Sequence, residues 1–207
     1  IKQTEPDIQV KTRELSEELT ENIRSFCKTA NVTIQPLLAT VYYFLLANKL
    51  NRTKIIIGTL FSGRATQEWN NTLGAFVNLL PIIFNYDSMI SVSTMIQDTA
   101  RQIAESSDYS FVPIEELNQL ARHDKEHTSI FEFILVYQNS MMPLNDLRVI
   151  EIDNGQGTDP FILEVREGVQ LQLIIKYSRS AFTEHDIEQF FVEIVDLLEN
   201  ITLKRED

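Results

Sequence analysis

The sequence predicts an α/β fold in which a mixed sheet and its flanking helices form two layers. Segments with the spacing of amphipathic helices alternate with short apolar runs that have the length of strands. The 207 residues, 43% of them hydrophobic, are enough for one substantial core. Because no repeat, low-complexity tract or polar linker interrupts the chain, residues 1–207 are expected to form a single domain.

In the first half of the chain, the pattern predicts an extended start at residues 1–11, then two helices and two strands. Apolar side chains recur at helical spacing up to about Asn31, a residue that tolerates a left-handed helix end. The next helix, residues 33–49, is apolar nearly all round and should be buried. Residues 54–62 and 75–86 are rich in Ile, Leu, Val and Phe, which predicts strands covered on both faces.

In the second half, amphipathic spacing predicts helices at residues 91–107 and 113–122. The final helix has an N-cap at Thr183, with Asp186 three residues later, and runs to about Asn200. The last two strands form a hairpin whose alternating pattern predicts at least one solvated face. The strands of this half are predicted at residues 130–137, 147–152, 161–165 and 169–177.

The charge balance argues against some classes of partner. The chain has 18 basic and 30 acidic side chains and a formal net charge of −12. Without a basic cluster it is not expected to bind nucleic acid or an anionic membrane surface. No apolar run approaches a membrane span, and the N-terminus has no signal-peptide pattern. The single cysteine, Cys27, predicts a buried thiol and fits a cytoplasmic protein.

The residue pattern alone indicates no self-sufficient active site. Gly58, Gly63 and Gly74 gather around the two central strands, which predicts a backbone that must turn sharply or be approached closely by a ligand. Residues 123–127 match the H-x-x-E-H spacing of a zinc peptidase family. They lie in a polar stretch with no apolar helix face and no matching third ligand, so a solvated loop is favoured and no metal site is expected.

Several motifs occur in a characteristic order along the chain, beginning with IIIGTLFSGR and LGAFVNLLP within residues 55–81. These two segments resemble a strand ending in Gly-Arg followed by G-x-F-V-N-T/L-L-P, a pattern of the second half of the condensation domains of nonribosomal peptide synthetases. Residues 106–111 stand where the family has H-Q-D-Y-P-F, residues 123–131 match parts of R-D…N-P-L-F, and residues 131–139 resemble F-Q-V-M-F-V-L-Q-N. The likeness covers nearly the whole chain. It implies the C-terminal lobe of a two-lobed, chloramphenicol-acetyltransferase-like fold.

The chain also departs from the family pattern. The family's catalytic motif, H-H-x-x-x-D-G, lies in the other lobe and is absent here, so the resemblance implies no catalytic residue in this chain. The Arg expected soon after L-P is replaced by Ile82-Ile83, and the His, Gln and Pro of H-Q-D-Y-P-F are also replaced. These losses are compatible with a divergent subfamily or with reduced activity.

The resemblance further implies a reaction and its partners. The complete domain would join two substrates, each held as a thioester on the 4'-phosphopantetheine arm of a carrier protein. The acceptor amine would attack the donor thioester and form a peptide bond, and the His of the missing lobe would orient or deprotonate that amine. The implied partners are the upstream N-terminal lobe, peptidyl or acyl carrier proteins and adjacent synthetase domains. No cofactor is expected to bind this chain directly, and the fragment alone is expected to be inactive.

The resemblance also implies a set of residues that line or support the substrate tunnel, namely Ser62, Gly63, Arg64, Phe76, Val77 and Asn78. Arg64 would pair with the Asp of the missing motif, although an ordinary surface position remains open. Phe76 and Val77 would line the donor side, with plain strand core as the alternative. Asn78 would offer a hydrogen-bonding group there.

Three other segments receive expectations from the same resemblance. Residues 64–73 would close the tunnel floor, and residues 155–168 would cross to the other lobe. Tyr109 and Phe111 are expected to be packing residues rather than chemical groups. If the partner lobe is missing, unpaired strand edges around residues 155–177 predict that the isolated chain associates with itself.

Two alternative functions remain open. One is a relative on the same fold, either an epimerisation domain or an acyltransferase that uses soluble thioesters; the F-V-N segment favours condensation over epimerisation by resemblance. The other is a non-catalytic module that docks carrier proteins, which the lost family residues keep open.

Overall fold

The structure is a computed structural model and describes residues 8–62, 72–73, 76–86, 90–121, 130–139 and 161–203. Its strands are β1 (Ile8–Glu14), β2 (Lys54–Ser62), β3 (Val77–Asn85), β4 (Phe133–Gln138), β5 (Phe161–Arg166) and β6 (Gln172–Ser178). Its helices are α1 (Glu17–Thr29), α2 (Ile34–Leu50), α3 (Val92–Ser107), α4 (Ile114–Ala121) and α5 (Glu184–Leu203).

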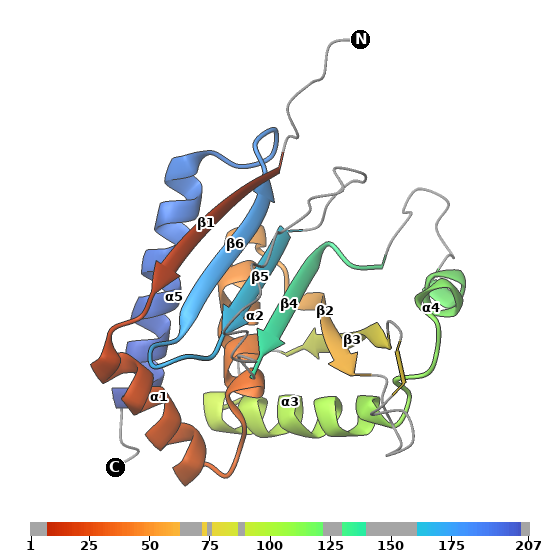
Figure 1. The fold of residues 1–207 in the computed structure, drawn as a ribbon, viewed down its shortest axis with the longest axis horizontal. Helices are drawn as coiled ribbons and strands as arrows, with labels where there is room; N and C mark the ends of the chain where they lie inside the picture. The colour runs from red at the N-terminus through yellow and green to blue at the C-terminus, as the bar shows by residue number, and fades with distance from the viewer. Residues whose placement is uncertain are drawn as a thin grey trace.

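The strands form one mixed sheet in the order β1-β6-β5-β4-β2-β3. Strand β4 is parallel to both β2 and β5, and the other neighbours are antiparallel. Helices α1, α2, α3 and α5 gather on one side of this sheet, while α4 stands beside the start of β3 (Figure 1). The predicted two-layer α/β fold is confirmed.

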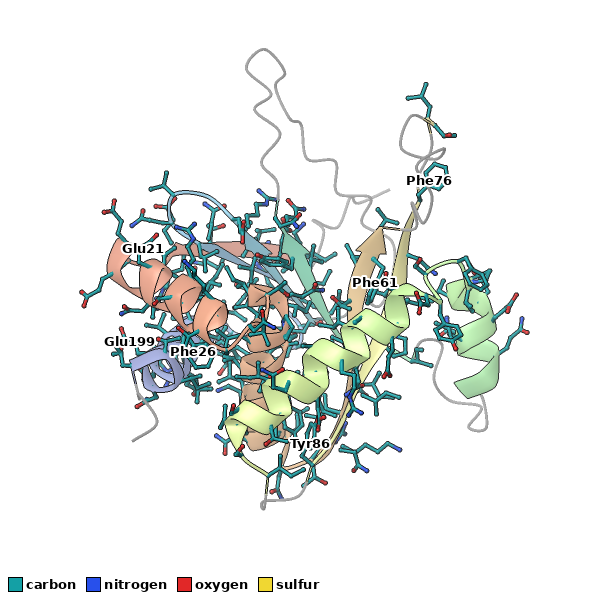
Figure 2. The ribbon with its side chains drawn as sticks, turned by 90° about the horizontal axis from the view of Figure 1, so that it is seen from below. Glu21, Phe26, Phe61, Phe76, Tyr86 and Glu199 are labelled. Atoms are coloured by element: carbon teal, nitrogen blue, oxygen red, sulfur yellow. The ribbon has the colours of Figure 1, made fainter. Side chains whose placement is uncertain are left out.

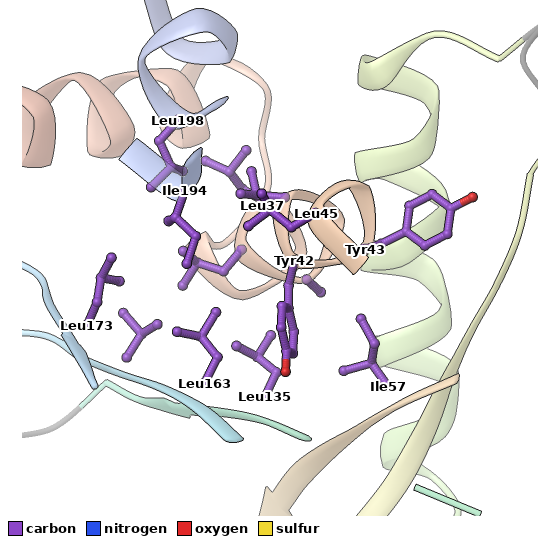
Figure 3. Packing of buried hydrophobic residues seen from close by; sticks show 14 of the residues in the cluster. Leu37, Tyr42, Tyr43, Leu45, Ile57, Leu135, Leu163, Leu173, Ile194 and Leu198 are labelled. Atoms are coloured by element: carbon purple, nitrogen blue, oxygen red, sulfur yellow. The ribbon is translucent and has the colours of Figure 1, made fainter. Parts of the chain in front are cut away.

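Helix α2 occupies the centre of the core, as its apolar sequence predicts. Its side chains meet α5 on one side and the sheet on the other (Figure 3). Tyr42 points from α2 toward the strands, is fully buried, and donates its hydroxyl hydrogen to the Phe161 carbonyl at 3.0 Å. That bond satisfies a hydroxyl which would otherwise be costly to bury.

The helix ends follow the predicted local signals. In the first turn of α5, the Thr183 hydroxyl accepts from the Asp186 amide at 3.2 Å, and the Asp186 carboxylate accepts from the Thr183 amide at 2.8 Å. These reciprocal bonds make a capping box with Asp in the acidic position. Asn31, just after α1, has the left-handed backbone expected of it, with φ of 53°.

The helical spacing of the sequence predicts that the first helix begins at Thr12, directly after the extended residues 1–11, and this start is wrong. Residues 8–14 form β1, which pairs antiparallel with β6, and the helix begins only at Glu17, after an N-cap at Ser16. The core-facing side of β1 carries Lys11 and Arg13, which make ion pairs with Glu184 and Glu188 of α5. A pairing partner more than 150 residues away overrides the local helical spacing.

The apolar sequences of the two central strands predicted that both faces of each strand would be covered. This prediction is wrong for β3. Strand β3 is the sheet edge, and Val77 and Ile83 are 64% and 47% exposed. The helices cover one side only, so alternate residues of β3 face solvent. The sequence also predicted unpaired strand edges around residues 155–177. For residues 161–177 this prediction is wrong, because β5 pairs with β4 and β6, and β6 pairs with β5 and β1.

Some predicted segments, including the strand at 147–152, lie outside the described residues. In the part of the chain that the structure describes, no single helix is long and apolar enough to span a membrane. Helices α1 and α2 pass that test only as a pair bent by 110°, and α2 is a buried core helix.

Candidate functional site

The described site residues gather where β2 ends and β3 begins. The antiparallel register places Ser62 opposite Val77 and Phe61 opposite Asn78. Phe76 immediately precedes the first residue of β3 and lies away from the helical layer (Figure 2). The pairing of β2 with β3 therefore brings together Ser62, Phe76, Val77 and Asn78, whereas Gly63 and Arg64 lie outside the described residues.

Asn78 is the most highly connected of these residues. Its side-chain amide donates to the carbonyl oxygens of Ser110 at 3.0 Å and Val112 at 2.5 Å. Its side-chain oxygen accepts from the backbone amide of Leu79 at 2.9 Å. Because a carboxamide has two N–H donors, both are used within this chain. Asn78 thereby ties the turn between α3 and α4 to the start of β3.

The turn that Asn78 holds presents two aromatic side chains to solvent. Tyr109 and Phe111 are 62% and 70% exposed, whereas Ser110 between them is buried. The expectation that these aromatics are packing residues is wrong. Consecutive 3₁₀-like bonds, including Val112 N–H to the Tyr109 carbonyl at 2.9 Å, close the turn so tightly that neighbouring side chains point in different directions.

A glycine in β2 is required by the close approach of two side chains, and not by a ligand as the sequence suggested. A Cβ atom built on Gly58 would lie 2.9 Å from Cδ1 of Phe131 and 3.2 Å from Cδ1 of Leu79. Phe131 is buried against this position, and the amide of the preceding Ile130 is held by the Asn118 side chain at 3.1 Å. The ring therefore packs directly on the β2 backbone, four residues before the strand reaches Ser62.

The site as described can position groups but contains no acid–base pair. Phe76, Val77 and Asn78 do not titrate near neutral pH. Elsewhere, burial raises the pKa of the Cys27 thiol to about 11, which makes it a buried, unreactive thiol, as predicted. Burial and a hydrogen bond to Glu167 raise the pKa of Tyr137. Among the described residues, no three His, Cys, Asp or Glu side chains converge to hold a metal.

A large hollow lies away from these residues. It measures about 1130 Å³ and is bounded by α1, α5 and the start of α3, with Phe26, Phe44 and Leu197 among its apolar walls. No charged side chain is among the described residues that line it. In Figure 2, Phe26 lies on the left, between α1 and α5, whereas Phe61 and Phe76 lie to the right of it, at the two-strand part of the sheet. The hollow and the β2–β3 end are separate places, and the predicted tunnel residues that the structure describes lie at the β2–β3 end.

Comparison with known proteins identifies the family. The family model described as "Condensation domain" matches residues 2–206, nearly the whole chain. The chain belongs to the condensation-domain family. In this family member, the F-V-N segment at residues 76–78 and the turn at residues 108–112 are thus neighbours in space, joined by the Asn78 side chain.

The curated relatives are large synthetases. Bacitracin synthase 1 of Bacillus licheniformis is 25% identical over 199 residues, which cover 91% of this chain and 4% of that protein. Tyrocidine synthase 3 of Brevibacillus parabrevis is 25% identical over 183 residues, which cover 83% of this chain and 3% of that protein. The chain thus spans only a small part of the length of the relatives it matches.

Solved structures share the fold. The four-domain nonribosomal peptide synthetase AB3403 matches with a TM-score of 0.83 and 16% identity, over 95% of this chain and 17% of that one. The condensation enzyme VibH matches with a TM-score of 0.75 and 12% identity, over 95% of this chain and 47% of that one. The fold of this chain is therefore that of condensation domains, with their chloramphenicol-acetyltransferase-like architecture.

Proposed function

We propose that this chain is the C-terminal lobe of a condensation domain that forms an amide bond between two carrier-bound thioesters. The observation that carries the proposal is the family match over residues 2–206. It is supported by coverage of 95% of this chain but only 47% of VibH, which is named as a condensation enzyme. The acyl and aminoacyl groups would arrive on the 4'-phosphopantetheine arms of carrier proteins, and the adjacent synthetase domains would supply them.

In this proposal the upstream lobe provides the H-H-x-x-x-D-G histidine, and this lobe provides the opposite wall of the tunnel. Ser62, Phe76 and Val77 stand at one strand end, where a tunnel wall can be built from two antiparallel strands. Arg64 would follow directly and pair with the Asp of the upstream motif. The 64% exposure of Val77 fits a side chain that meets something outside this lobe.

Peptide transfer between two loaded carrier proteins, detected by intact mass, tests this proposal. The reaction is run with this chain alone, with the upstream lobe restored, and with that lobe carrying an alanine in place of its second motif histidine. Transfer only with the intact restored lobe is the expected result. Transfer by this chain alone, or with the substituted histidine at full rate, would refute the division of labour between lobes.

An epimerisation domain is the second candidate, because one shares this fold. The epimerisation domain from the third module of tyrocidine synthetase B matches with a TM-score of 0.72 and 16% identity, over 96% of this chain and 49% of that one. Chiral analysis of the carrier-bound residue, before and after incubation, separates the two activities. Inversion without transfer would support epimerisation. Carrier binding without either reaction would support a docking module.

A further inference from the structure

We propose that Asn78 is a positioning residue: it fixes the turn at residues 108–112, and through that turn it places the exposed rings of Tyr109 and Phe111 beside the β2–β3 end. This inference rests on the proposed function, because the end of the sheet matters for transfer only if it faces the substrate path. Asn78 acts through the turn and need not touch a substrate.

The first step of the argument is that every amide hydrogen of Asn78 is committed. The two donors reach the carbonyls of Ser110 and Val112, and Asn78 accepts from Leu79. These carbonyls lie 32 and 34 residues away in sequence, so the side chain bridges elements that no local structure connects. Only a carboxamide of this length donates twice and accepts once from this position.

The second step is that, among the described residues, Asn78 supplies hydrogen bonds that join the turn itself to the sheet. Tyr109 and Phe111 are mostly exposed, and their rings contribute little burial to the anchoring. Ser110 is buried, and its backbone is one of the two groups that Asn78 binds. Helix α4 makes few contacts with β3, and helix α3 is bound to β3 through Gln102 and Ile83, before the turn begins. The position of the turn between these two helices therefore depends on the Asn78 bonds.

The substitution Asn78→Asp tests this with a distinctive pH dependence. A carboxylate would face two carbonyl oxygens, which repel it and raise its pKa, whereas the protonated acid can donate one bond. Acidic neighbours act in the same direction. The titratable or charged groups described on α3, the turn and α4 are Asp98, Arg101, Glu105, Asp108, Tyr109, Glu115 and Glu116. Arg101 is paired with Asp98, and Lys54 of β2 lies at the opposite end of the strand pair from Asn78, so the acidic groups predominate. We call the two hydrogen bonds from residue 78 to the Ser110 and Val112 carbonyls the clamp. In Asn78→Asp the clamp should therefore be lost at neutral pH and partly return as pH falls.

Hydrogen exchange of the peptide covering residues 108–114 is the first readout, measured from pH 5 to 8 and divided by the wild-type rate at each pH. In Asn78→Asp we expect exchange about tenfold faster at pH 8, as two lost hydrogen bonds of ordinary strength would give, and less than about threefold faster at pH 5. Asn78→Ala should be fast at every pH. Asn85→Asp, an exposed position on the same strand, is the matched control and should stay at the wild-type rate.

Peptide transfer by the restored domain is the second readout. The ratio of the variant rate to the wild-type rate should follow the same pH profile as the exchange ratio, with Asn85→Asp unchanged. Exchange that is unaffected in Asn78→Asp overturns the clamp. Faster exchange with transfer equal to wild type at every pH overturns the positioning role. If the wild-type domain transfers nothing, the proposed function fails, and the exchange profile still decides whether Asn78 fixes the turn.

Discussion

Replacing Gly58 with alanine should destabilise the fold by overpacking. The added Cβ would meet the Phe131 ring at 2.9 and 3.0 Å and Leu79 at 3.2 Å, distances that real Cβ atoms rarely or never show. Phe131 is only 4% exposed, so the ring cannot swing into solvent without losing its burial. Overpacking typically costs about 1–3 kcal/mol. Restricting the unfolded chain returns about 0.4–1 kcal/mol. The net loss of unfolding free energy should be about 1–2 kcal/mol.

Urea unfolding followed by circular dichroism measures this loss, and a second background tests its cause. In Phe131→Leu the flat ring is replaced by a smaller side chain that can change rotamer. The cost of Gly58→Ala should then fall below about 0.5 kcal/mol, giving a coupling energy of about 1 kcal/mol between the two positions. An equal cost in both backgrounds would refute the argument, because the Phe131 contact would then not be its source.

Three further predictions concern the core, the thiol and the sheet edge. Tyr42→Phe leaves the buried Phe161 carbonyl without its donor and should cost about 1–3 kcal/mol in urea unfolding; an undiminished stability would contradict this. The Cys27 pKa is raised by burial from 9.0 to about 11, so its stabilisation is complete below pH 9 and is lost as pH rises through 11, by up to about 2–3 kcal/mol. Cys27→Ala should flatten that alkaline decline, and an unchanged slope would count against it. Gln102→Ala frees the Ile83 amide and carbonyl at the β3 edge and should give concentration-dependent light scattering that Gln97→Ala does not.

Local chemistry made part of this fold predictable. The buried α2 follows from a segment that is apolar nearly all round, and the start of α5 follows from Thr183 and Asp186. Such signals act over three or four residues, so the sequence displays them directly. The proximity of Ser62 and Val77 could also be predicted from the sequence, because two apolar runs joined by a loop favour an antiparallel pair of strands.

The remaining features depend on contacts between distant residues. Residues 8–11 were predicted to be extended, but the pairing of β1 and its continuation to Glu14 were missed. The partner β6 lies at the other end of the chain, and alternation over seven residues is a weak signal. The Asn78 bonds were missed because nothing in the F-V-N segment specifies which backbone carbonyls it will meet. The exposure of Tyr109 and Phe111 was predicted wrongly because aromatic character suggests burial, whereas the tight turn directs both rings outward.

The edge strand β3 limits how this chain can meet another molecule. Ile83 points its amide and carbonyl away from β2, and both are bound by the Gln102 side chain at 3.1 Å. By the alternation of an antiparallel pair, positions 79 and 81 point the same way. The Leu79 amide is bound by Asn78, and Pro81 has no amide hydrogen. Three successive outward positions thus offer no free donor, so strand addition here is disfavoured. A partner at this end must instead meet side chains, and Val77, Tyr109 and Phe111 are among the exposed apolar ones that the described structure presents there.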